Sequence, residues 1–310
     1  MPVALFTHPA CLEHDPGGWH PECPDRLRAV LRALEAPEFT ALLRELAPAA
    51  TPAQLLRVHS EAYVTAILAI RPPQGETVPL DADTVMSTGS AEAALRAAGG
   101  AVAAVDAVMA GWARAAFVAV RPPGHHAEPG RAGGFCLFNN AAIAAEQARA
   151  HWGLKRIAVV DFDVHHGNGT EATFGPDPDL FYGSTHQYPC YPGTGAATMR
   201  GAAGNIVNAP LPPGSDGAAF RAAWAENILP ALDRFAPELL IISAGFDAHH
   251  ADPLAELRLD VADFAWLSER LVASAGRHCQ NRVVSVLEGG YNLDVLAAAS
   301  RAHVRALMRN

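Results

Sequence analysis

Short apolar runs alternate along this chain with longer alanine-rich stretches of helical periodicity. The apolar runs predict six strands, at Val3–Phe6, Ala116–Val120, Ile157–Val160, Leu180–Tyr182, Leu239–Ser243 and Val283–Leu287. Because these runs are almost entirely apolar, they are typical of strands buried on both faces of a parallel sheet. The longer stretches predict helices at Asp25–Leu34, Ala91–Ala110, Asn140–His151, Gly217–Asp233, Val261–Gly276 and Leu293–Met308. Strand–helix alternation of this kind indicates an α/β fold with right-handed crossovers.

The segments between these elements give no sign of a domain boundary. Proline and glycine collect in four loops, Arg71–Gly75, Arg121–Gly134, Pro189–Gly195 and Pro210–Gly217, and the longest of these carry histidine, aromatic and acidic residues, unlike flexible linkers. We find no internal repeat. Since an α/β chain of 310 residues is often one domain, we expect a single domain.

Unusual polar residues stand directly after the predicted strands. Five strands are followed by segments rich in histidine, aspartate or tyrosine, at Arg121–His126, Asp161–Gly169, Gly183–His186, Ala244–His250 and Glu288–Tyr291. The carboxyl ends of parallel strands meet at one edge of an open sheet, and ligands bind in the crevice beyond that edge. Each segment alone is a weak indication, but five together predict a functional site there.

Asp163 and His165 are the first candidates for metal ligands. Residues two apart in an extended segment point the same way, so both can reach one ion. Asp247, after another strand, would complete a three-ligand site with an open position for water, as in catalytic zinc sites. The alternative is a capping aspartate and a core histidine. Asp161 weakens that alternative, because a carboxylate buried at the sheet edge needs a partner.

The pair His125-His126 supplies two imidazoles for acid–base chemistry. A hydrolase that uses water needs a base for the water proton and an acid for the leaving amine. A histidine bonded to a carboxylate becomes more basic, whereas one bonded to a neutral amide keeps a lower pKa. Asp161 and Asn168 could provide these two environments. A solvated turn is the alternative.

Tyr291 and the pair His249-His250 complete the set of candidates. Tyr291 follows Gly289-Gly290, so the backbone can approach a ligand closely, and the phenol could donate to a developing oxyanion. A core tyrosine after a glycine turn is the alternative. For His249 and His250 we expect a place near the rim of the site or behind it, not metal ligation.

Composition excludes several classes of function. The chain has 23 Lys+Arg against 32 Asp+Glu and a net charge of -9, which argues against a nucleic-acid binder. Its five cysteines form no CxxC pair, so we expect reduced thiols in a cytoplasmic protein. The beginning of the sequence lacks the features of a signal peptide. The most apolar stretch, residues 97–120, is interrupted by Asp106 and Arg114, so no membrane span is predicted.

Together these motifs resemble the histone deacetylase superfamily, which has the arginase–deacetylase fold. The resemblance runs through nearly the whole chain, over His20–Leu27, Arg121–Glu128, Gly134–Asn140, Asp161–Gly169, Gly245–Asp247 and Glu288–Tyr291. Asn168, where class I enzymes carry Asp, and the Glu-Gly-Gly-Tyr form resemble class II enzymes and bacterial deacetylase-like amidohydrolases. The resemblance implies one deacetylase domain over residues 1–310, with a predominantly parallel, approximately eight-stranded sheet flanked by helices.

The resemblance also implies a reaction, the hydrolysis of an N-acetyl amide to acetate and a free amine. The zinc ligands would be Asp163, His165 and Asp247. His126 resembles the general base and acid, and His125 its electrostatic partner. Their hydrogen-bond partners match Asp161 and Asn168, and Tyr291 matches the transition-state donor. The metal would polarise the acetyl carbonyl and lower the pKa of its water toward about 7, although a histidine with two carboxylates also suits ferrous iron.

Further positions of the family pattern concern the substrate and potassium. The walls of an acyl-lysine tunnel match Phe135 and Tyr191 beside Gly134, with Tyr191 in place of the more usual Phe. Leu254 stands where a polyamine-selective relative carries a Glu, and of Asp81 and Asp83 we favour Asp83 as the acceptor for the substrate backbone. A first structural potassium site would use Asp161, Asp163, His165 and Ser184, partly through backbone carbonyls. A second would lie near Phe174, Asp177 and Leu180.

Four functions follow as hypotheses. The first is a metal-dependent deacylase for acyl-lysine or a small acetylated amine, and the second is an acetylpolyamine amidohydrolase. An arginase or agmatinase with two manganese ions is disfavoured, because His249 stands where a further Asp ligand is needed. A non-enzymatic acyl-lysine reader is disfavoured because neither a ligand nor Tyr291 is lost. The physiological substrate, the acyl length and a homo-oligomeric state stay open at this stage.

Overall fold

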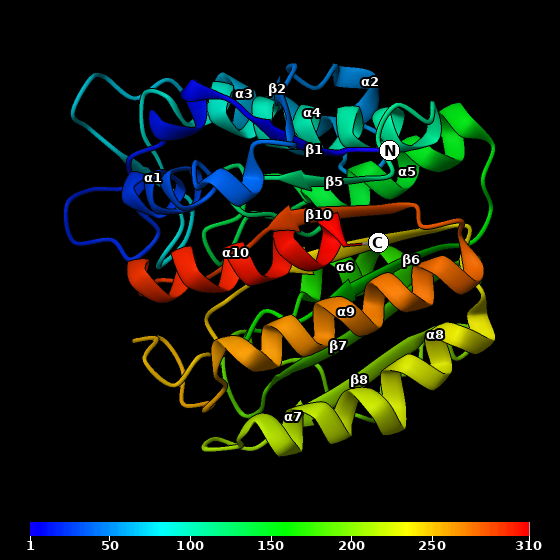
Figure 1. The fold of residues 1–310 in the computed structure, drawn as a ribbon. Helices are drawn as coiled ribbons and strands as arrows, with labels where there is room; N and C mark the ends of the chain where they lie inside the picture. The colour runs from blue at the N-terminus through cyan, green and yellow to red at the C-terminus, as the bar shows by residue number, and fades with distance from the viewer. Residues whose placement is uncertain (310) are drawn as a thin grey trace.

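Eight strands form one sheet, which lies at the centre of the molecule (Figure 1). The computed structural model describes residues 1–309. The strand order is β2-β1-β5-β10-β9-β6-β7-β8, and all neighbours pair in parallel. In that order the strands span Leu43–Leu46, Val3–Thr7, Ala115–Val118, Val283–Leu287, Leu239–Ala244, Ile157–Asp161, Leu180–Gln187 and Ile206–Leu211. A separate antiparallel pair is formed by β3 (Val78–Pro79) and β4 (Val85–Met86).

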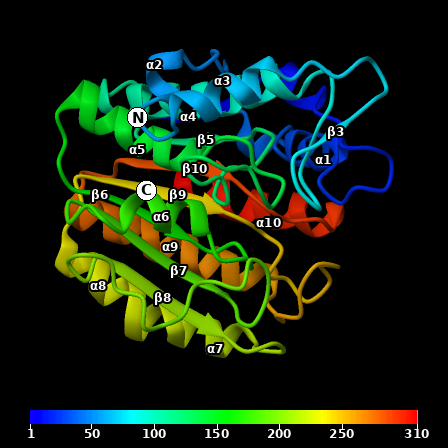
Figure 2. The same ribbon diagram turned by 180° about the vertical axis from the view of Figure 1, so that it is seen from behind.

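Helices cover both faces of the sheet, which makes three layers. One layer contains α1 (Pro24–Ala33), α10 (Leu293–Met308), α9 (Val261–His278), α8 (Leu229–Phe235) and α7 (Gly217–Ala223). α10 lies between α1 and α9, and α9 also contacts α8 and α7. The last four of these helices stand in front of the sheet in Figure 1. Figure 2 shows the other side, with α4 (Ser90–Met109) and α5 (Asn140–Trp152) packed together near α2 (Pro52–Leu55), α3 (Glu61–Ala69) and α6 (Asn168–Phe174). Short turns of helix occur at Pro9–Leu12, Pro37–Phe39 and Trp224–Ile228.

All six predicted strands are present, and two more form the edges of the sheet. Every residue of β5, β6, β9 and β10 is buried, as uniformly apolar runs require. The sequence did not predict β2, which is largely exposed and carries Arg44 and Glu45. Nor did it predict β8, where Asn208 and Pro210 interrupt the apolar pattern. Proline is tolerated there because β8 is an edge strand and need not donate on its outer side.

Two predicted boundaries are corrected by the structure. β7 does not end at Tyr182 but continues to Gln187 and pairs with β8 from Tyr182 onward, so Ser184 and His186 lie within the strand and not beyond it. The single predicted helix Gly217–Asp233 is divided by a π turn at Trp224–Ile228. Pro230 accounts for this turn, since it has no N–H for the carbonyl one turn earlier and disfavours a regular α-helix at that point.

Among residues 1–309, no helix combines the length and the apolar character that crossing a membrane requires.

A buried ion cluster joins the N-terminal segment to the centre of the sheet. The carboxylate of Glu22 accepts hydrogen bonds from Arg121, which follows β5, at 2.5 and 2.7 Å and from Arg26 of α1 at 2.9 Å. All three side chains are fully buried. Although burial opposes ionisation, the charge of Arg121 and contacts with His14 and Arg26 hold the pKa of Glu22 well below its usual value, so the cluster is ionised.

Replacing Glu22 by Gln should lower the free energy of unfolding by roughly 3–5 kcal/mol, because two buried guanidinium groups would lose their counter-charge. Urea denaturation measures the change. The matched control is Glu38→Gln. Glu38 also binds two arginines, Arg301 and Arg305, but at the surface, where ion pairs contribute little. Equal midpoints for the two variants would contradict the structural weight assigned to the buried cluster.

Candidate active site

Three predicted metal ligands meet at the carboxyl edge of the sheet. Asp163 and His165 follow β6, Asp247 follows β9, and these two strands are neighbours. His165 Nδ1 lies 3.1 Å from Asp163 Oδ1 and 3.2 Å from Asp247 Oδ2, and all three residues are buried. Within residues 1–309 this is one of two groups of three such side chains that could hold a metal ion.

Backbone N–H groups hold the two carboxylates in place. Gly289 donates to Asp163 Oδ2 at 2.8 Å, and Val164 donates to Asp247 Oδ1 at the same distance. A Cβ atom at Gly289 would overlap the carboxylate oxygens of both aspartates. Glycine at this position is therefore required by the close approach of the backbone to the carboxylates.

The donor set fits a divalent cation. Burial, together with the negative charge of Asp163, raises the pKa of Asp247 to about 7, so the charge of Asp163 disfavours the ionised form of Asp247. A cation between them would remove that repulsion. One imidazole with two carboxylates matches the ligands of catalytic zinc, and it leaves a position for a further ligand.

The two neighbouring histidines have different partners. His125 Nδ1 lies 2.9 Å from Asp161 Oδ2, and His126 Nδ1 lies 2.8 Å from the amide oxygen of Asn168. Asn168 Nδ2 donates to Glu128 Oε1 at 2.7 Å. Because the Glu128 carboxylate binds the NH₂ group of Asn168, the amide oxygen of Asn168 faces His126. His126 must therefore donate from Nδ1, which leaves Nε2 as its proton acceptor.

These partners move the two pKa values in opposite directions. Burial lowers the pKa of His125, but the carboxylates of Asp161 and Asp163 outweigh it and raise the pKa to about 10. Burial, and then the neighbouring imidazoles of His125 and His165, hold the pKa of His126 well below its usual value. At neutral pH, His125 is therefore cationic and His126 is neutral. Of these two adjacent histidines, the first supplies a positive charge and the second can accept a proton.

A cavity of about 180 Å³ opens above this cluster. It is lined by eight side chains or backbone segments that include all five predicted substrate-binding residues: Asp83, His126, Gly134, Phe135, His165, Tyr191, Leu254 and Tyr291. The Phe135 and Tyr291 rings are 5.9 Å apart, and those of His126 and Tyr191 are 5.0 Å apart, both edge to face. The cavity is thus narrow and largely aromatic.

Tyr291 reaches this cavity with its hydroxyl protonated. Burial raises the pKa of the phenol well above its usual value. The guanidinium of Arg26 lies 4.8 Å from the centre of the tyrosine ring, and its Nε donates to the carbonyl of Gly290 at 2.6 Å. A protonated phenol held at the wall of a narrow cavity can donate to an oxygen that develops negative charge.

Two supporting carboxylates were missed by the sequence analysis. Glu128 orients Asn168 as described above. Glu288 is fully buried, accepts from the backbone N–H groups of Gly124 and His125 at 2.7 and 3.2 Å, and accepts from Ser243 Oγ. Both residues lie within motifs that carry the family resemblance, Arg121–Glu128 and Glu288–Tyr291. An acidic residue in an otherwise buried segment was the one feature of the sequence that could have indicated them.

The predicted potassium ligands also come together in two places. Asp161 and Ser184 are direct partners across β6 and β7, and Asp163 and His165 follow Asp161 by two and four residues. The backbone carbonyls of Phe174, Asp177 and Leu180 converge on Nδ2 of Asn205, at 2.8 to 2.9 Å. Potassium binding at both places stays a prediction.

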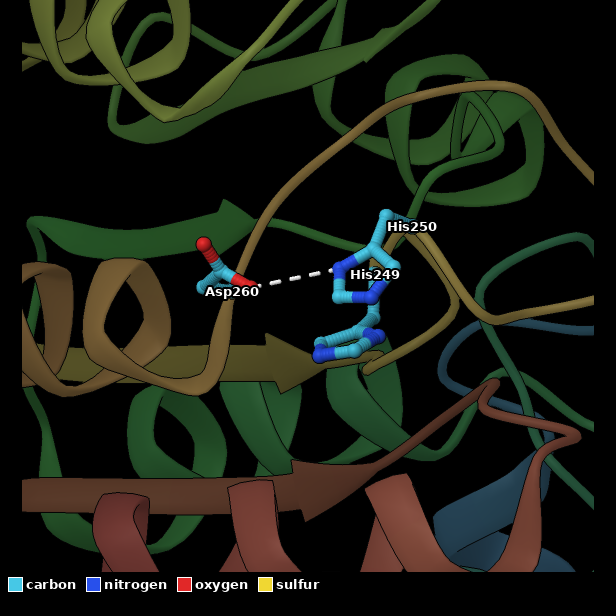
Figure 3. A group of neighbouring side chains, drawn as sticks. All are labelled: His249, His250 and Asp260. Carbon is cyan, nitrogen blue, oxygen red and sulfur yellow. Dashed lines mark ion pairs between the residues drawn. The ribbon is translucent and has the colours of Figure 1, made fainter.

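His249, His250 and Asp260 form the second group that could hold a metal ion (Figure 3). The Nδ1 atom of each histidine already has a partner, however. His249 Nδ1 accepts from the N–H of Ala251 at 3.1 Å, and His250 Nδ1 lies 3.2 Å from Asp260 Oδ1. The contact of His250 with Asp260 joins the two ends of the loop between β9 and α9, and the contact of His249 is local. Both favour a structural role over metal ligation.

The family model of the histone deacetylase domain matches residues 20–307. The chain belongs to the histone deacetylase family. It is 40% identical to the histone deacetylase-like amidohydrolase of Pseudomonas aeruginosa, over 94% of this chain and 82% of that protein. It is 38% identical to a probable deacetylase of Archaeoglobus fulgidus, over 95% of this chain and 82% of that protein.

A solved member of the histone deacetylase family confirms the predicted fold. The crystal structure of the HDA15 HD domain matches with a TM-score of 0.93 and 35% identity, over 100% of this chain and 90% of that one. The eight-stranded parallel sheet flanked by helices, in a single domain, is therefore the arginase–deacetylase architecture expected from the sequence. Family membership supports a hydrolase of the deacetylase type.

Gly134→Ala should lower kcat/KM for an acetylated substrate by roughly 10²-fold, because small displacements in an active site have effects of that order. Gly134 has a φ of 53°, and a Cβ there would overlap the His126 ring and approach Tyr191. The control is Gly130→Ala on the same loop, where a Cβ meets nothing within 4 Å. Unchanged turnover by the Gly134 variant would show that this close approach is unimportant.

Proposed function

We propose that this member of the histone deacetylase family is a zinc-dependent amidohydrolase that removes acetyl or related acyl groups from N-acyl-lysine or a similar amine. The observation that carries the proposal is the convergence of three ligands, two differently tuned histidines and one protonated tyrosine at the base of a single narrow cavity. Such a combination provides an electrophile, a proton acceptor and an oxyanion donor, which amide hydrolysis requires together.

Asp163, His165 and Asp247 would hold the metal. When bound, a zinc ion would supply Lewis acidity, polarising the acyl carbonyl and making a water molecule more acidic. Ferrous iron fits the same donors, so the identity of the metal is an outcome for metal analysis. We also propose the two structural potassium sites, one at Asp161 and Ser184 and the other at the carbonyls around Asn205, on the basis of the resemblance and the convergence of these groups.

His126 would move the proton in this reaction. Its Nε2 accepts the proton of the attacking water as the new C–O bond forms. The same nitrogen then gives the proton to the amine nitrogen as the C–N bond breaks, so the products are a carboxylate and a free amine. The hydrogen bond from Nδ1 to Asn168 keeps the ring in the tautomer that this step needs, and the low pKa of His126 keeps it neutral beforehand.

His125 and Tyr291 would stabilise the negative charge that develops on the acyl oxygen during the reaction. The positive charge of His125 lies beside Asp163, at 3.8 Å from its carboxylate. The Tyr291 hydroxyl donates a hydrogen bond to the oxyanion. Interactions that strengthen only as this charge develops lower the barrier without binding the substrate more tightly.

The shape of the cavity supports a substrate with an unbranched alkyl chain. Phe135 and Tyr191 offer ring surfaces to methylene groups, and Asp83 lies at the cavity with a carboxylate for a backbone N–H of a peptide substrate. Leu254 gives the rim an apolar residue where a polyamine cation would need a carboxylate. We therefore favour acyl-lysine over acetylated polyamines, and we propose a cytoplasmic protein that binds neither nucleic acid nor membranes.

Tyr291→Phe should reduce kcat by roughly 10²–10³-fold, the effect of removing one oxyanion donor, while the variant folds and retains its metal. Turnover of an acetyl-lysine peptide and metal content per chain measure the two effects. Tyr188→Phe is the matched control, because Tyr188 does not line the cavity and 38% of its surface is exposed. Near-full turnover by Tyr291→Phe would remove this residue from the mechanism.

A comparison of substrates separates the deacylase from the acetylpolyamine amidohydrolase. We expect the wild-type protein to have a higher kcat/KM for an acetyl-lysine peptide than for acetylputrescine. Leu254→Glu should shift this ratio toward acetylputrescine, because the carboxylate would attract the distal ammonium group. Leu56→Glu, also a partly exposed leucine but away from the cavity, should leave the ratio unchanged. A wild-type preference for acetylputrescine would favour the second function.

A further inference from the structure

The backbone around Tyr291 has little rigidity of its own. Tyr291 follows two glycines, and Gly290 has a φ of 119°, a conformation that imposes few local restraints on the chain. The hydroxyl of Tyr291 must nevertheless be placed accurately to act as an oxyanion donor. Contacts with other segments therefore have to fix its position.

One side of this segment is held by Arg26. Its Nε donates to the carbonyl of Gly290 at 2.6 Å, and its Nη2 donates to the carbonyl of Glu288 at 2.5 Å. A guanidinium only donates hydrogen bonds, so it can bind backbone carbonyls but not N–H groups. The N–H groups that follow Gly290 therefore need another partner.

Asp252 holds the other side. Its Oδ2 accepts from the N–H of Tyr291 at 2.7 Å and from the N–H of Asn292 at 3.2 Å. Its Oδ1 accepts from the N–H of Leu254 at 3.1 Å. The Asp252 residue is 6% exposed, so these hydrogen bonds are shielded from water. The bond from Tyr291 is also short, at 2.7 Å, as strong hydrogen bonds to a carboxylate are.

The same carboxylate thus connects two walls of the cavity. Tyr291 and Leu254 both line the cavity, and they come from segments nearly forty residues apart in the chain. Asp252 itself does not line the cavity and touches no reacting atom. It lies in the loop between β9 and α9, five positions after Asp247, and its own N–H bonds to the carbonyl of His249 at 2.9 Å.

We propose that Asp252 is a positioning residue that sets Tyr291 and Leu254 relative to each other, and that this arrangement determines how well Tyr291 serves as the oxyanion donor. The effect of Asp252 on turnover rests on the proposed function. Its effect on the position of Tyr291 rests only on the contacts above. An amide in place of the carboxylate can accept with only one oxygen, so its NH₂ group would face one of the backbone N–H donors without a partner.

Asp252→Asn should lower kcat for an acetyl-lysine peptide by about 10²-fold, with KM little changed, because the loss falls on an interaction made in the transition state. In the Tyr291→Phe background the same substitution should have little further effect, since Asp252 acts through Tyr291. Glu256→Gln, in the same loop but exposed, is the control and should leave kcat unchanged. Losses that multiply in the double variant would overturn the proposal.

A second measurement does not depend on turnover. The chain has five tyrosines, so a fluorotyrosine-labelled protein gives few ¹⁹F resonances, and Tyr291→Phe assigns the one from Tyr291. Asp252→Asn should shift or broaden that resonance, and Glu256→Gln should not. An unmoved Tyr291 resonance would overturn the proposal even in an active protein. A shifted resonance in a protein without deacylase activity would uphold the positioning and refute the proposed function instead.

Asp252→Glu provides a second variant, because it keeps the negative charge but moves the carboxylate one methylene away from its three N–H donors. We expect it to fold, as urea denaturation would show, and to lower kcat in the same direction as Asp252→Asn. Full activity together with an unmoved Tyr291 resonance in a folded Asp252→Glu protein would also overturn the proposal.

Discussion

Four carboxylates lie within the carboxyl edge of one sheet, and most of the site follows from how their charges are accommodated. Asp161, Asp163, Asp247 and Glu288 are each no more than 1% exposed. Buried charges of one sign are strongly unfavourable unless each has hydrogen bonds or a counter-charge. Backbone N–H groups beyond the strand ends donate hydrogen bonds to three of these carboxylates, and the imidazole of His125 pairs with the fourth. Glycine is needed where the backbone supplies the hydrogen bond, because a Cβ would occupy the space of the carboxylate. The remaining charge at Asp163 and Asp247 leaves a place for a cation.

The same crowding makes two adjacent histidines chemically unlike. His125 faces Asp161 and is held as a cation, whereas His126 faces a neutral amide and is kept neutral by burial and by the charge next to it. The difference depends on Asn168 being an amide whose orientation Glu128 fixes. An aspartate at position 168 would raise the pKa of His126 and reduce the contrast. The charge balance of the site is therefore set by residues that do not touch the cavity.

The strands that are buried on both faces could be predicted from the sequence, but the two edge strands of the sheet could not. Runs such as Ile157–Val160 identify strands because both of their faces are covered, while β2 and β8 each have an open side and mixed composition. The site residues could be placed at one edge from topology alone, and their roles came from the resemblance to a known family. Glu128, Glu288 and Asp252 could not be assigned in this way. Their function consists of hydrogen bonds to groups distant in the chain, as between Glu288 and Gly124, and no local pattern of the sequence encodes such a pairing.

The segment Gly289–Tyr291 shows how the requirements of charge and of precision conflict. Glycine at 289 allows the backbone to approach Asp163 and Asp247, but a run of two glycines cannot by itself hold the tyrosine that follows. Precision is restored from outside, by a guanidinium from α1 on the carbonyls and a carboxylate from the β9–α9 loop on the N–H groups. Arg26 in turn is neutralised by Glu22, which also binds Arg121. The buried ion cluster that joins the N-terminal segment to the sheet is thus continuous with the support of Tyr291. Residues of α1 therefore bear on the position of Tyr291, although none of them lines the cavity.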